Sequence, residues 1–378
     1  MISQNKEIKM VDLQTQYHHI KNEIDSGIAG VMESGAFVNG PPVKKFAKDL
    51  ATYLDVAHVI PCGNGTDALQ IALMALGLKP GDEVITVAFT FVATAEVIAL
   101  LGLKPVFVDI DPETFNIDVS KIEEKITNRT KCIIPVHLFG QSSDMESIMQ
   151  IAEKHNLYVI EDNAQAIGSE YTFSNGKTQK TGTIGHIGTT SFYPSKNLGC
   201  YGDGGALFTN DEALGEQIRR IANHGQKVKY HYSDIGVNSR LDSFQAVVLN
   251  AKLPHLDDYV AKRQEAAAYY DKAFSDHPNL RIPIRAKNST HVFHQYTLLV
   301  DGDRDTLKGA LKEKGIPTMV YYPHPLHLEP AYLEYGYKAG DLPVTEKHAK
   351  SVISLPMHTE LDEEQLEVIV GVILNIVS

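Results

Sequence analysis

Cysteine is scarce in this chain, and the few cysteines present form no recognisable pattern. The 378 residues include three of them, Cys62, Cys132 and Cys200. Because they are odd in number, far apart and without a CxxC pair, they argue against a disulfide framework and against a zinc knuckle. We therefore expect the protein to work in a reducing compartment.

Long hydrophobic runs are also missing. The first residues, 1–7, lack the apolar stretch of a secretory signal peptide, and no later run is long enough to cross a bilayer. The formal net charge of −12 argues against nucleic acid or an anionic membrane as the main partner. We expect a cytoplasmic protein, although a local basic cluster could still bind an anionic small molecule.

Several well-known catalytic motifs are absent. No Walker loop, no GxSxG elbow and no GxGxxG after a first strand occur, which argues against the hydrolase and Rossmann classes. The 16 histidines include the close groups His18-His19 and His324 with His327, but neither has HExxH spacing or acidic partners. We expect no metal site.

Short apolar segments alternate with helical patterns from about Val56 to Thr209. This alternation predicts an α/β fold with a mostly parallel sheet covered on both faces. We expect strands at His58–Pro61, Glu83–Val87, Pro105–Asp109, Cys132–Leu138, Tyr158–Glu161, Thr189–Tyr193 and Ala206–Thr209, and helices at Asp67–Leu78, Ala93–Gly102 and Met145–His155. The first of these helices is apolar nearly all round, so we expect it to be buried.

The pattern changes after Leu241, and the chain length favours about two domains. We place the boundary between residues 255 and 256. Residues 1–255 would hold an N-terminal segment and a large α/β domain, and residues 256–378 a small α+β domain. The later elements are expected at Asp242–Ala251, Tyr259–Phe274, Gln295–Val300, Arg304–Lys314, Pro317–Tyr322 and Glu363–Val377.

Lys196 is the strongest candidate for chemistry. It follows a predicted strand and precedes the glycine-rich stretch Gly202–Gly205. A solvated loop lysine is the commonest alternative, but Phe192, Tyr193 and Leu198 flank it and argue against full exposure. Partial desolvation lowers the pKa of a lysine, which is what an amine needs to attack a carbonyl.

Asp162 ends another predicted strand. By itself it could simply cap a helix, but the carboxyl ends of parallel strands are where ligands bind. Together with Lys196 it suggests a Schiff-base cofactor site, in which the carboxylate is the partner of a pyridinium nitrogen. Gln165 could reach the same ligand.

The segment Gly63–Ala68 joins a strand to the buried helix. Its glycines and the free N–H groups at a helix start could bind a phosphate, with the Thr66 hydroxyl added, although a plain capped turn explains the loop equally well. Ser191 and Ser195 are further hydroxyl donors. Phe91 could stack on a planar ring, but an aromatic here is more often a core residue.

The two segments His224–Tyr232 and Gly236–Asp242 concentrate His, Lys and Arg in an otherwise acidic chain. They could hold an anionic substrate such as a diphosphate or a carboxylate. A solvated basic loop is the alternative.

Taken in order, the motifs Gly63–Leu69, Glu161–Gln165, Ser191–Gly199, Gly202–Gly205 and Asn238–Asp242 resemble the DegT/DnrJ/EryC1/StrS family. These are fold-type I, pyridoxal 5'-phosphate-dependent nucleotide-sugar aminotransferases, and the resemblance extends from Val11 to His358.

The resemblance implies a role for each matching residue. Lys196 would carry the cofactor covalently and move a proton, and Asp162 would pair with the pyridine nitrogen. Gln165 would contact the ring oxygen or ring face, and Phe91 would stack on the ring. The phosphate would be held by Gly65, Thr66 and Ser191, with Asn238 reaching it from the other subunit of a homodimer with shared active sites.

The resemblance also implies a substrate. Glutamate would donate the amine, leaving 2-oxoglutarate, and the branch looks most like the enzymes that aminate C3 of UDP-2-acetamido-2-deoxy-3-keto-glucuronic acid for polysaccharide or O-antigen biosynthesis. Substrate-binding residues would be Arg240, His224, Lys227 and His324. Alternatives are a 3- or 4-aminotransferase on a dTDP-, UDP- or GDP-linked keto-6-deoxy sugar, and a non-catalytic regulator that binds the cofactor. A dehydrase branch carries His where this chain keeps Lys196.

Overall fold

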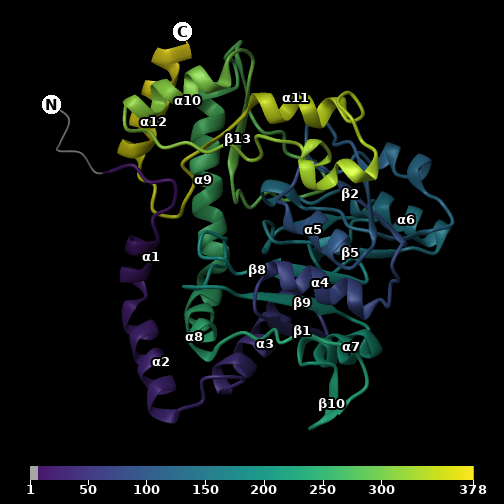
Figure 1. Ribbon diagram of the computed structural model, residues 1–378. Helices are drawn as coiled ribbons and strands as arrows, with labels where there is room; N and C mark the ends of the chain where they lie inside the picture. The colour runs from purple at the N-terminus through teal and green to yellow at the C-terminus, as the bar shows by residue number, and fades with distance from the viewer. Residues whose placement is uncertain (1–6, 378) are drawn as a thin grey trace.

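A seven-stranded sheet forms the centre of the computed structural model, which describes residues 7–377 (Figure 1). Its order is β1-β9-β8-β5-β4-β2-β3, and all neighbours from β8 to β3 run parallel, whereas β9 is antiparallel to β1 and β8. The mostly parallel sheet is therefore confirmed. The strands are β1 (His58–Cys62), β2 (Glu83–Val87), β3 (Lys104–Val108), β4 (Thr130–Ile133), β5 (Tyr158–Asp162), β8 (Ile187–Ser191) and β9 (Gly205–Thr209).

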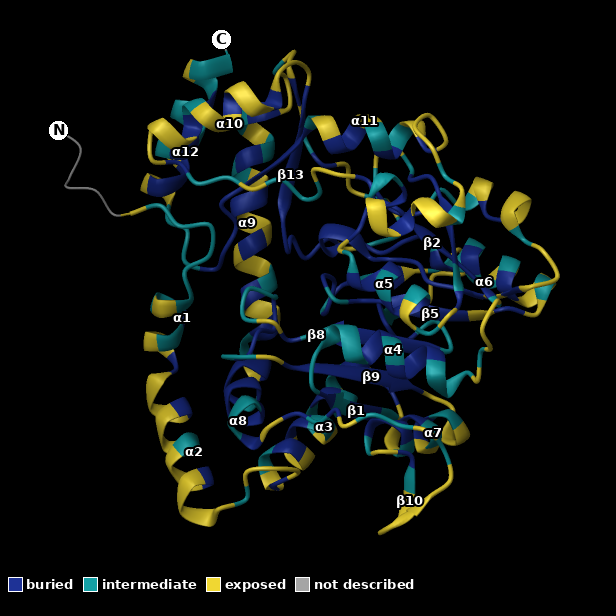
Figure 2. Ribbon diagram, viewed as in Figure 1, coloured by how far each residue is buried: buried dark blue, intermediate teal, exposed yellow. Residues whose placement is uncertain are grey.

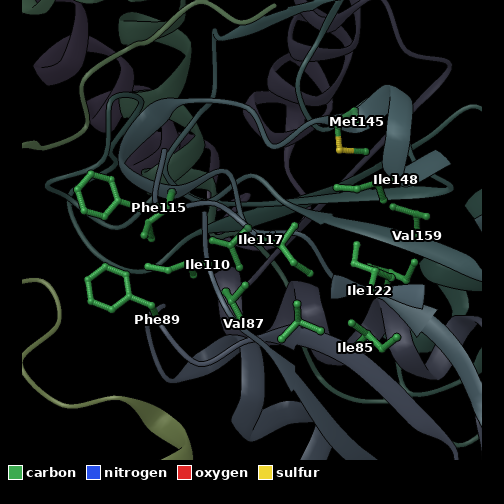
Figure 3. Close-up of a cluster of buried hydrophobic side chains, with 14 of the residues drawn as sticks. Ile85, Val87, Phe89, Ile110, Phe115, Ile117, Ile122, Met145, Ile148 and Val159 are labelled. Carbon is green, nitrogen blue, oxygen red and sulfur yellow. The ribbon is translucent and has the colours of Figure 1, made fainter. Parts of the chain in front are cut away.

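Both faces of this sheet are covered. Because successive strand residues point to opposite faces, Val84 joins one buried apolar cluster while Ile85 and Val87 join another, drawn in Figure 3. Helix α4 lies in the first cluster, as predicted from its apolar sequence, and buries Leu69 and Leu73. The covering helices are α3 (Pro41–Leu54), α4 (Gly65–Ala75), α5 (Ala93–Leu100), α6 (Met145–His155), α7 (Glu212–Ala222) and α8 (Ser243–Lys252).

A smaller antiparallel sheet of three strands follows later in the chain. It has the order β12-β13-β14 and shares an apolar cluster with three helices. In Figure 1 the long helix α9 runs from beside the large sheet to this second group. Its elements are α9 (Leu256–Phe274), β12 (Leu280–Arg281), β13 (Tyr296–Val300), α10 (Arg304–Glu313), β14 (Val352–Leu355) and α12 (Glu363–Val377). The domain boundary between residues 255 and 256 stays a prediction, and α9 begins at this point.

The remaining elements surround these two sheets. Residues Ile20 and Ile24 of the N-terminal arm pack on Val248 and Ala251 of α8. Figure 2 shows that the hairpin containing β10 is largely exposed and projects away from the body. These elements are α1 (Leu13–His19), α2 (Lys21–Ser34), β6 (Glu170–Thr172), β7 (Thr178–Lys180), β10 (Gln226–Val228), β11 (His231–Tyr232), α11 (Pro343–Ser351) and the 3-10 turns Val119–Lys121, Glu123–Lys125, Leu138–Gly140, Leu253–His255, Leu326–Leu328 and Pro330–Tyr335. Within residues 7–377, no helix combines the length and hydrophobicity needed to cross a membrane.

Three predicted strands need correction. The strand predicted at Cys132–Leu138 stops at Ile133; beyond it Val136 makes only an isolated bridge to Asp162, and a 3-10 turn begins at Leu138. The strand predicted at Thr189–Tyr193 lies instead at Ile187–Ser191; the Phe192 N–H still donates to the Gly204 carbonyl at 2.7 Å, and turns begin at Pro194. The segment Pro317–Tyr322 forms no strand and makes only an isolated bridge from Met319 to Ser354. Proline at its first position has no N–H for a ladder.

Candidate active site

The predicted site residues meet at one edge of the large sheet, where parallel strands end. Asp162 is the last residue of β5 and Ser191 the last of β8. Gly65 begins α4 directly against Ser191: a Cβ added at Gly65 would lie 2.8 Å from the Ser191 Cβ. Only glycine permits this approach, which brings the predicted phosphate loop beside the strand that leads to Lys196.

Lys196 lies in a tight turn after β8. Its backbone N–H donates to the Tyr193 carbonyl at 2.8 Å, and the Cys200 N–H closes the turn on the Phe192 carbonyl at 2.8 Å. Burial lowers the pKa of the side-chain amine to about 8, and the nearby Asp162 carboxylate opposes that shift only in part. No described residue hydrogen-bonds or ion-pairs with this amine, so it is free to meet a ligand.

Asp162 is 5% exposed and holds two hydrogen bonds. The Thr94 hydroxyl donates to Oδ2 at 2.8 Å, and the Ala164 N–H donates to Oδ1 at 3.2 Å. Burial raises the pKa of this carboxyl above its ordinary value, and the two hydrogen bonds and the charge of Lys196 offset that shift only in part. Residues 164–168 form turns, so Asp162 is not the cap of an α-helix.

Gln165 and Phe91 border the same region, next to a residue that the sequence did not single out. The Gln165 Oε1 accepts from the Phe139 N–H at 2.7 Å, and its Nε2 donates to the Tyr322 hydroxyl at 3.1 Å. The rings of Phe91 and Tyr322 lie 6.4 Å apart. Phe91 is 54% exposed, so it is not a core residue, and its ring is open to a ligand.

The loop before α4 is at once a capped turn and a set of free donors. Asn64 caps the helix through its Oδ1, which accepts from the Asp67 N–H at 2.8 Å. The N–H groups of Gly65 and Thr66, at the first helical positions, have no acceptor among the described residues. These donors and the positive end of the helix dipole favour an anion at this place.

The four residues predicted to bind substrate lie further out. His224 is exposed just before β10, and Lys227 is exposed within β10. His324 is exposed two residues after Tyr322 in the chain. Arg240 is partly buried near Gly63, and a Cβ on that glycine would be 3.9 Å from the Arg240 carbonyl oxygen. Among residues 7–377, no hydrogen bond or ion pair joins these side chains to Lys196 or Asp162. Asn238 is exposed as well, beside Ser239, whose hydroxyl donates to Asp67 Oδ2 at 2.6 Å.

A buried pair behind Asp162 was not predicted. His137 and Glu161 are fully buried, with the His137 Nε2 at 2.8 Å from the Glu161 Oε2. The Ser143 N–H donates to His137 Nδ1, so Nε2 is the protonated nitrogen. Glu161 also accepts three backbone N–H groups, those of Gly182, Ile184 and Gly185. It thereby ties β5 to the turn that leads into β8. The only sequence feature that could have pointed to Glu161 is its position next to Asp162.

Comparisons with known proteins agree with this arrangement. A model of the DegT/DnrJ/EryC1/StrS aminotransferase family matches residues 18–374. A Geobacillus stearothermophilus protein named pleiotropic regulatory protein is 52% identical and covers 96% of each chain. The UDP-2-acetamido-2-deoxy-3-oxo-D-glucuronate aminotransferase of Pseudomonas aeruginosa is 46% identical, covering 97% of this chain and 100% of its own. The structure of NtdA from Bacillus subtilis with bound cofactor PMP superposes with a TM-score of 0.90 at 33% identity, covering 100% of this chain and 86% of its own.

The residues at the sheet edge fit pyridoxal phosphate. Two free N–H groups at the start of α4 suit its phosphate, and the unpaired amine of Lys196 suits its aldehyde. The buried carboxylate of Asp162 suits its ring nitrogen. Glycine at position 65 also leaves room for the phosphate, because any side chain there would occupy the space between the start of α4 and Ser191.

Proposed function

The chain belongs to the DegT/DnrJ/EryC1/StrS aminotransferase family, and we propose that it transfers the amino group of glutamate to C3 of UDP-2-acetamido-2-deoxy-3-keto-glucuronic acid. The membership confirms the resemblance read from the sequence. The protein is a sugar aminotransferase that uses pyridoxal phosphate, and its fold is fold type I of the enzymes with this cofactor.

The observation that carries the residue roles is the unpaired, partly desolvated amine of Lys196 beside the buried carboxylate of Asp162. When bound, the cofactor supplies an electron sink for the carbon that gains or loses the amine. Lys196 binds the cofactor and moves the proton at that carbon, since its lowered pKa leaves part of the amine uncharged near neutral pH. Asp162 holds the proton of the ring nitrogen.

The other predicted residues bind and orient. The N–H groups of Gly65 and Thr66, with the Ser191 hydroxyl, bind the phosphate at the start of α4. The exposed ring of Phe91 covers one face of the cofactor ring, and Gln165 lies near the ring oxygen. Lys196→Ala should reduce turnover by orders of magnitude, because both the covalent attachment and the proton transfer lose their group. Near-normal turnover would refute these roles.

The choice of a uronate rests on Arg240 and the basic segment around it. A guanidinium can form two parallel hydrogen bonds with a carboxylate, and the Arg240 side chain has no partner among residues 7–377. His224, Lys227 and His324 would contact the diphosphate or the glutamate carboxylates. The sugar named for the Pseudomonas aeruginosa relative carries such a carboxylate.

A matched pair of substrates tests this choice. UDP-2-acetamido-2-deoxy-3-keto-glucuronic acid and the corresponding 3-keto-glucosamine differ only in the carboxylate at C6. Arg240→Ala should lower kcat/KM for the uronate by about 10- to 100-fold, the usual value of a charged hydrogen bond, and change the neutral sugar by less than about threefold. Equal losses on both substrates would contradict the uronate role. A panel with dTDP-linked 4-keto-6-deoxy sugars, read by product mass, covers the alternative substrates.

We propose a homodimer in which Asn238 and Arg240 serve the partner's site. Exposed apolar side chains support this, since a monomer seldom presents so many on one segment: Val228, Tyr230, Tyr232 and Ile235. Mixing inactive Lys196→Ala with the impaired Arg240→Ala protein and allowing exchange should raise activity on the uronate to about a quarter of normal, because half of the dimers then hold one intact site. No recovery after proven exchange would mean that each site is built from one chain.

The Geobacillus relative is named as a regulatory protein, so a regulator that binds the cofactor is the second candidate function. A regulator that only binds the cofactor would show no absorbance change when glutamate is added, whereas an aminotransferase converts the bound cofactor to its amine form. We also propose a cytoplasmic place in polysaccharide or O-antigen sugar biosynthesis, because nucleotide-linked sugars are activated precursors. Cell fractionation of the tagged protein tests the location.

A further inference from the structure

Two buried threonines lie directly behind Asp162. Thr90 precedes α5 and Thr94 is in its first turn, and each is 1% exposed. The Thr94 Oγ1 lies 2.8 Å from Asp162 Oδ2, 3.1 Å from the Thr90 Oγ1 and 3.3 Å from the Phe91 carbonyl oxygen. Thr94 therefore links the carboxylate on β5 to the loop that carries Phe91.

The direction of these hydrogen bonds follows from proton counting. A hydroxyl has one proton, and an ionised carboxylate can only accept. The Thr94 proton therefore goes to Asp162 Oδ2, which is the shortest of its three contacts. Thr94 must then accept from Thr90, so the hydroxyls form a chain from Thr90 through Thr94 to Asp162. An Asp162 protonated on Oδ2 would reverse this order.

Helix capping does not explain the arrangement. Helix α5 begins after Val92 without any side-chain hydrogen bond at its N-cap. The contact of the Thr94 hydroxyl with the Phe91 carbonyl oxygen is 0.5 Å longer than the hydrogen bond to Asp162, the difference between 3.3 and 2.8 Å. The groups that face the Asp162 carboxyl are the Thr94 hydroxyl, the Ala164 N–H, Lys196 and His137. Thr94 is the only side chain among the described residues that donates a hydrogen bond to it.

We propose that Thr94, itself oriented by Thr90, is a positioning residue that keeps Asp162 ionised and fixed in place for the ring nitrogen of the cofactor. This inference rests on the proposed role of Asp162. Burial alone favours the neutral acid, and a neutral acid cannot hold a protonated ring nitrogen as an ion pair. The hydroxyl of Thr94 opposes that tendency at the oxygen it contacts.

Thr94→Val tests the proposal, since valine keeps the shape and loses the hydroxyl. Fluorescence titration of the apoprotein should show cofactor binding about tenfold weaker at pH 7, the value of one hydrogen bond to a charged group. Without this donor Asp162 takes up a proton at higher pH, so affinity should also begin to fall at a higher pH as the solution is acidified. Turnover should lose more in kcat than in KM. Thr94→Ser should restore all three readouts to within about twofold.

Two further variants separate the outcomes. Thr90→Val should weaken binding by about threefold, because it removes only the donor behind Thr94. If Asp162→Asn weakens cofactor binding but Thr94→Val does not, the inference is overturned and the proposed role of Asp162 stands. If Thr94→Ser is as impaired as Thr94→Val, packing and not the hydroxyl is responsible, which also overturns it. Unchanged binding in Asp162→Asn would refute both the role of Asp162 and the inference built on it.

Discussion

The amine of Lys196 predicts how fast the apoprotein captures its cofactor at neutral pH. Its pKa is lowered from 10.5 to about 8 because burial disfavours the ammonium. With a pKa of 8, about 10% of the amine is uncharged at pH 7, against about 0.03% for an ordinary lysine. Since only the uncharged amine attacks an aldehyde, Lys196 should react about 300-fold faster than a solvated lysine at that pH.

Stopped-flow absorbance can measure this. Apoprotein is mixed with pyridoxal phosphate at a series of pH values, and Nα-acetyl-lysine amide is treated in parallel. Dividing the two rate constants removes the ionisation of the cofactor itself from the comparison. The capture rate of Lys196 should rise with pH and level off above a midpoint near 8, whereas the model amine should keep rising towards pH 10.

Asp162→Asn tests the direction in which the carboxylate shifts the pKa of Lys196. The carboxylate raises the pKa of the Lys196 amine, so removing its charge should move the midpoint below that of the native protein. The midpoint is compared and not the amplitude, because this substitution also affects cofactor binding. A midpoint near pH 10 in the native protein, or a higher midpoint in Asp162→Asn, would contradict the argument that desolvation activates the lysine.

Three further outcomes are expected. Lys196→Met should raise the unfolding free energy of the apoprotein at pH 7 by on the order of 1 kcal/mol. Because the pKa of Lys196 is depressed in the folded state, the native protein itself becomes more stable between pH 8 and 10.5. Urea unfolding should therefore show that the advantage of the variant disappears near pH 10.5, and an advantage that does not change with pH would contradict the argument. Glu161→Gln should cost about 2–4 kcal/mol in thermal unfolding, because an NH2 group then faces N–H donors, and an unchanged Tm would refute this. Tyr322→Phe should lower the unfolding free energy by about 1 kcal/mol and raise KM, because the Gln165 Nε2 loses its hydrogen-bond acceptor. An unchanged KM would mean that this hydrogen bond does not contribute to substrate binding.

The central sheet could be predicted because its signals are local. Strands such as Glu83–Val87 are short apolar segments between helical patterns, and buried parallel strands need little else. Lys196 and Asp162 were proposed as site residues for the same reason, since Asp162 ends such a segment and Lys196 follows another by a few residues. Segment Pro317–Tyr322 has similar composition, but it pairs with β14 only at the single bridge from Met319 to Ser354, and strand formation depends on a longer pairing.

The rest of the site depends on contacts between distant segments. Tyr322 contacts Gln165 only because the segment after α10 folds back over the sheet edge, and no local sequence pattern predicts this. Thr94 has a weak local signal, a threonine four residues after Thr90 at a helix start, but its partner Asp162 lies on another strand. The side chains of Arg240 and Asn238 have no hydrogen-bond or ion-pair partner within the described chain that would reveal their use, so sequence likeness is what points to them.

Burial shifts the pKa of both Lys196 and Asp162 towards the neutral form, but only Asp162 has hydrogen bonds that oppose the shift. Desolvation pushes Lys196 towards its neutral amine and Asp162 towards its neutral acid. Asp162 receives donors from Thr94 and Ala164, which favour its charged form, whereas the Lys196 amine has no acceptor among residues 7–377. The amine is therefore left free to become a nucleophile, while the two donors to the carboxylate limit how far burial raises its pKa. An acceptor introduced beside Lys196 should thus slow cofactor capture, even though the lysine and its burial would be unchanged.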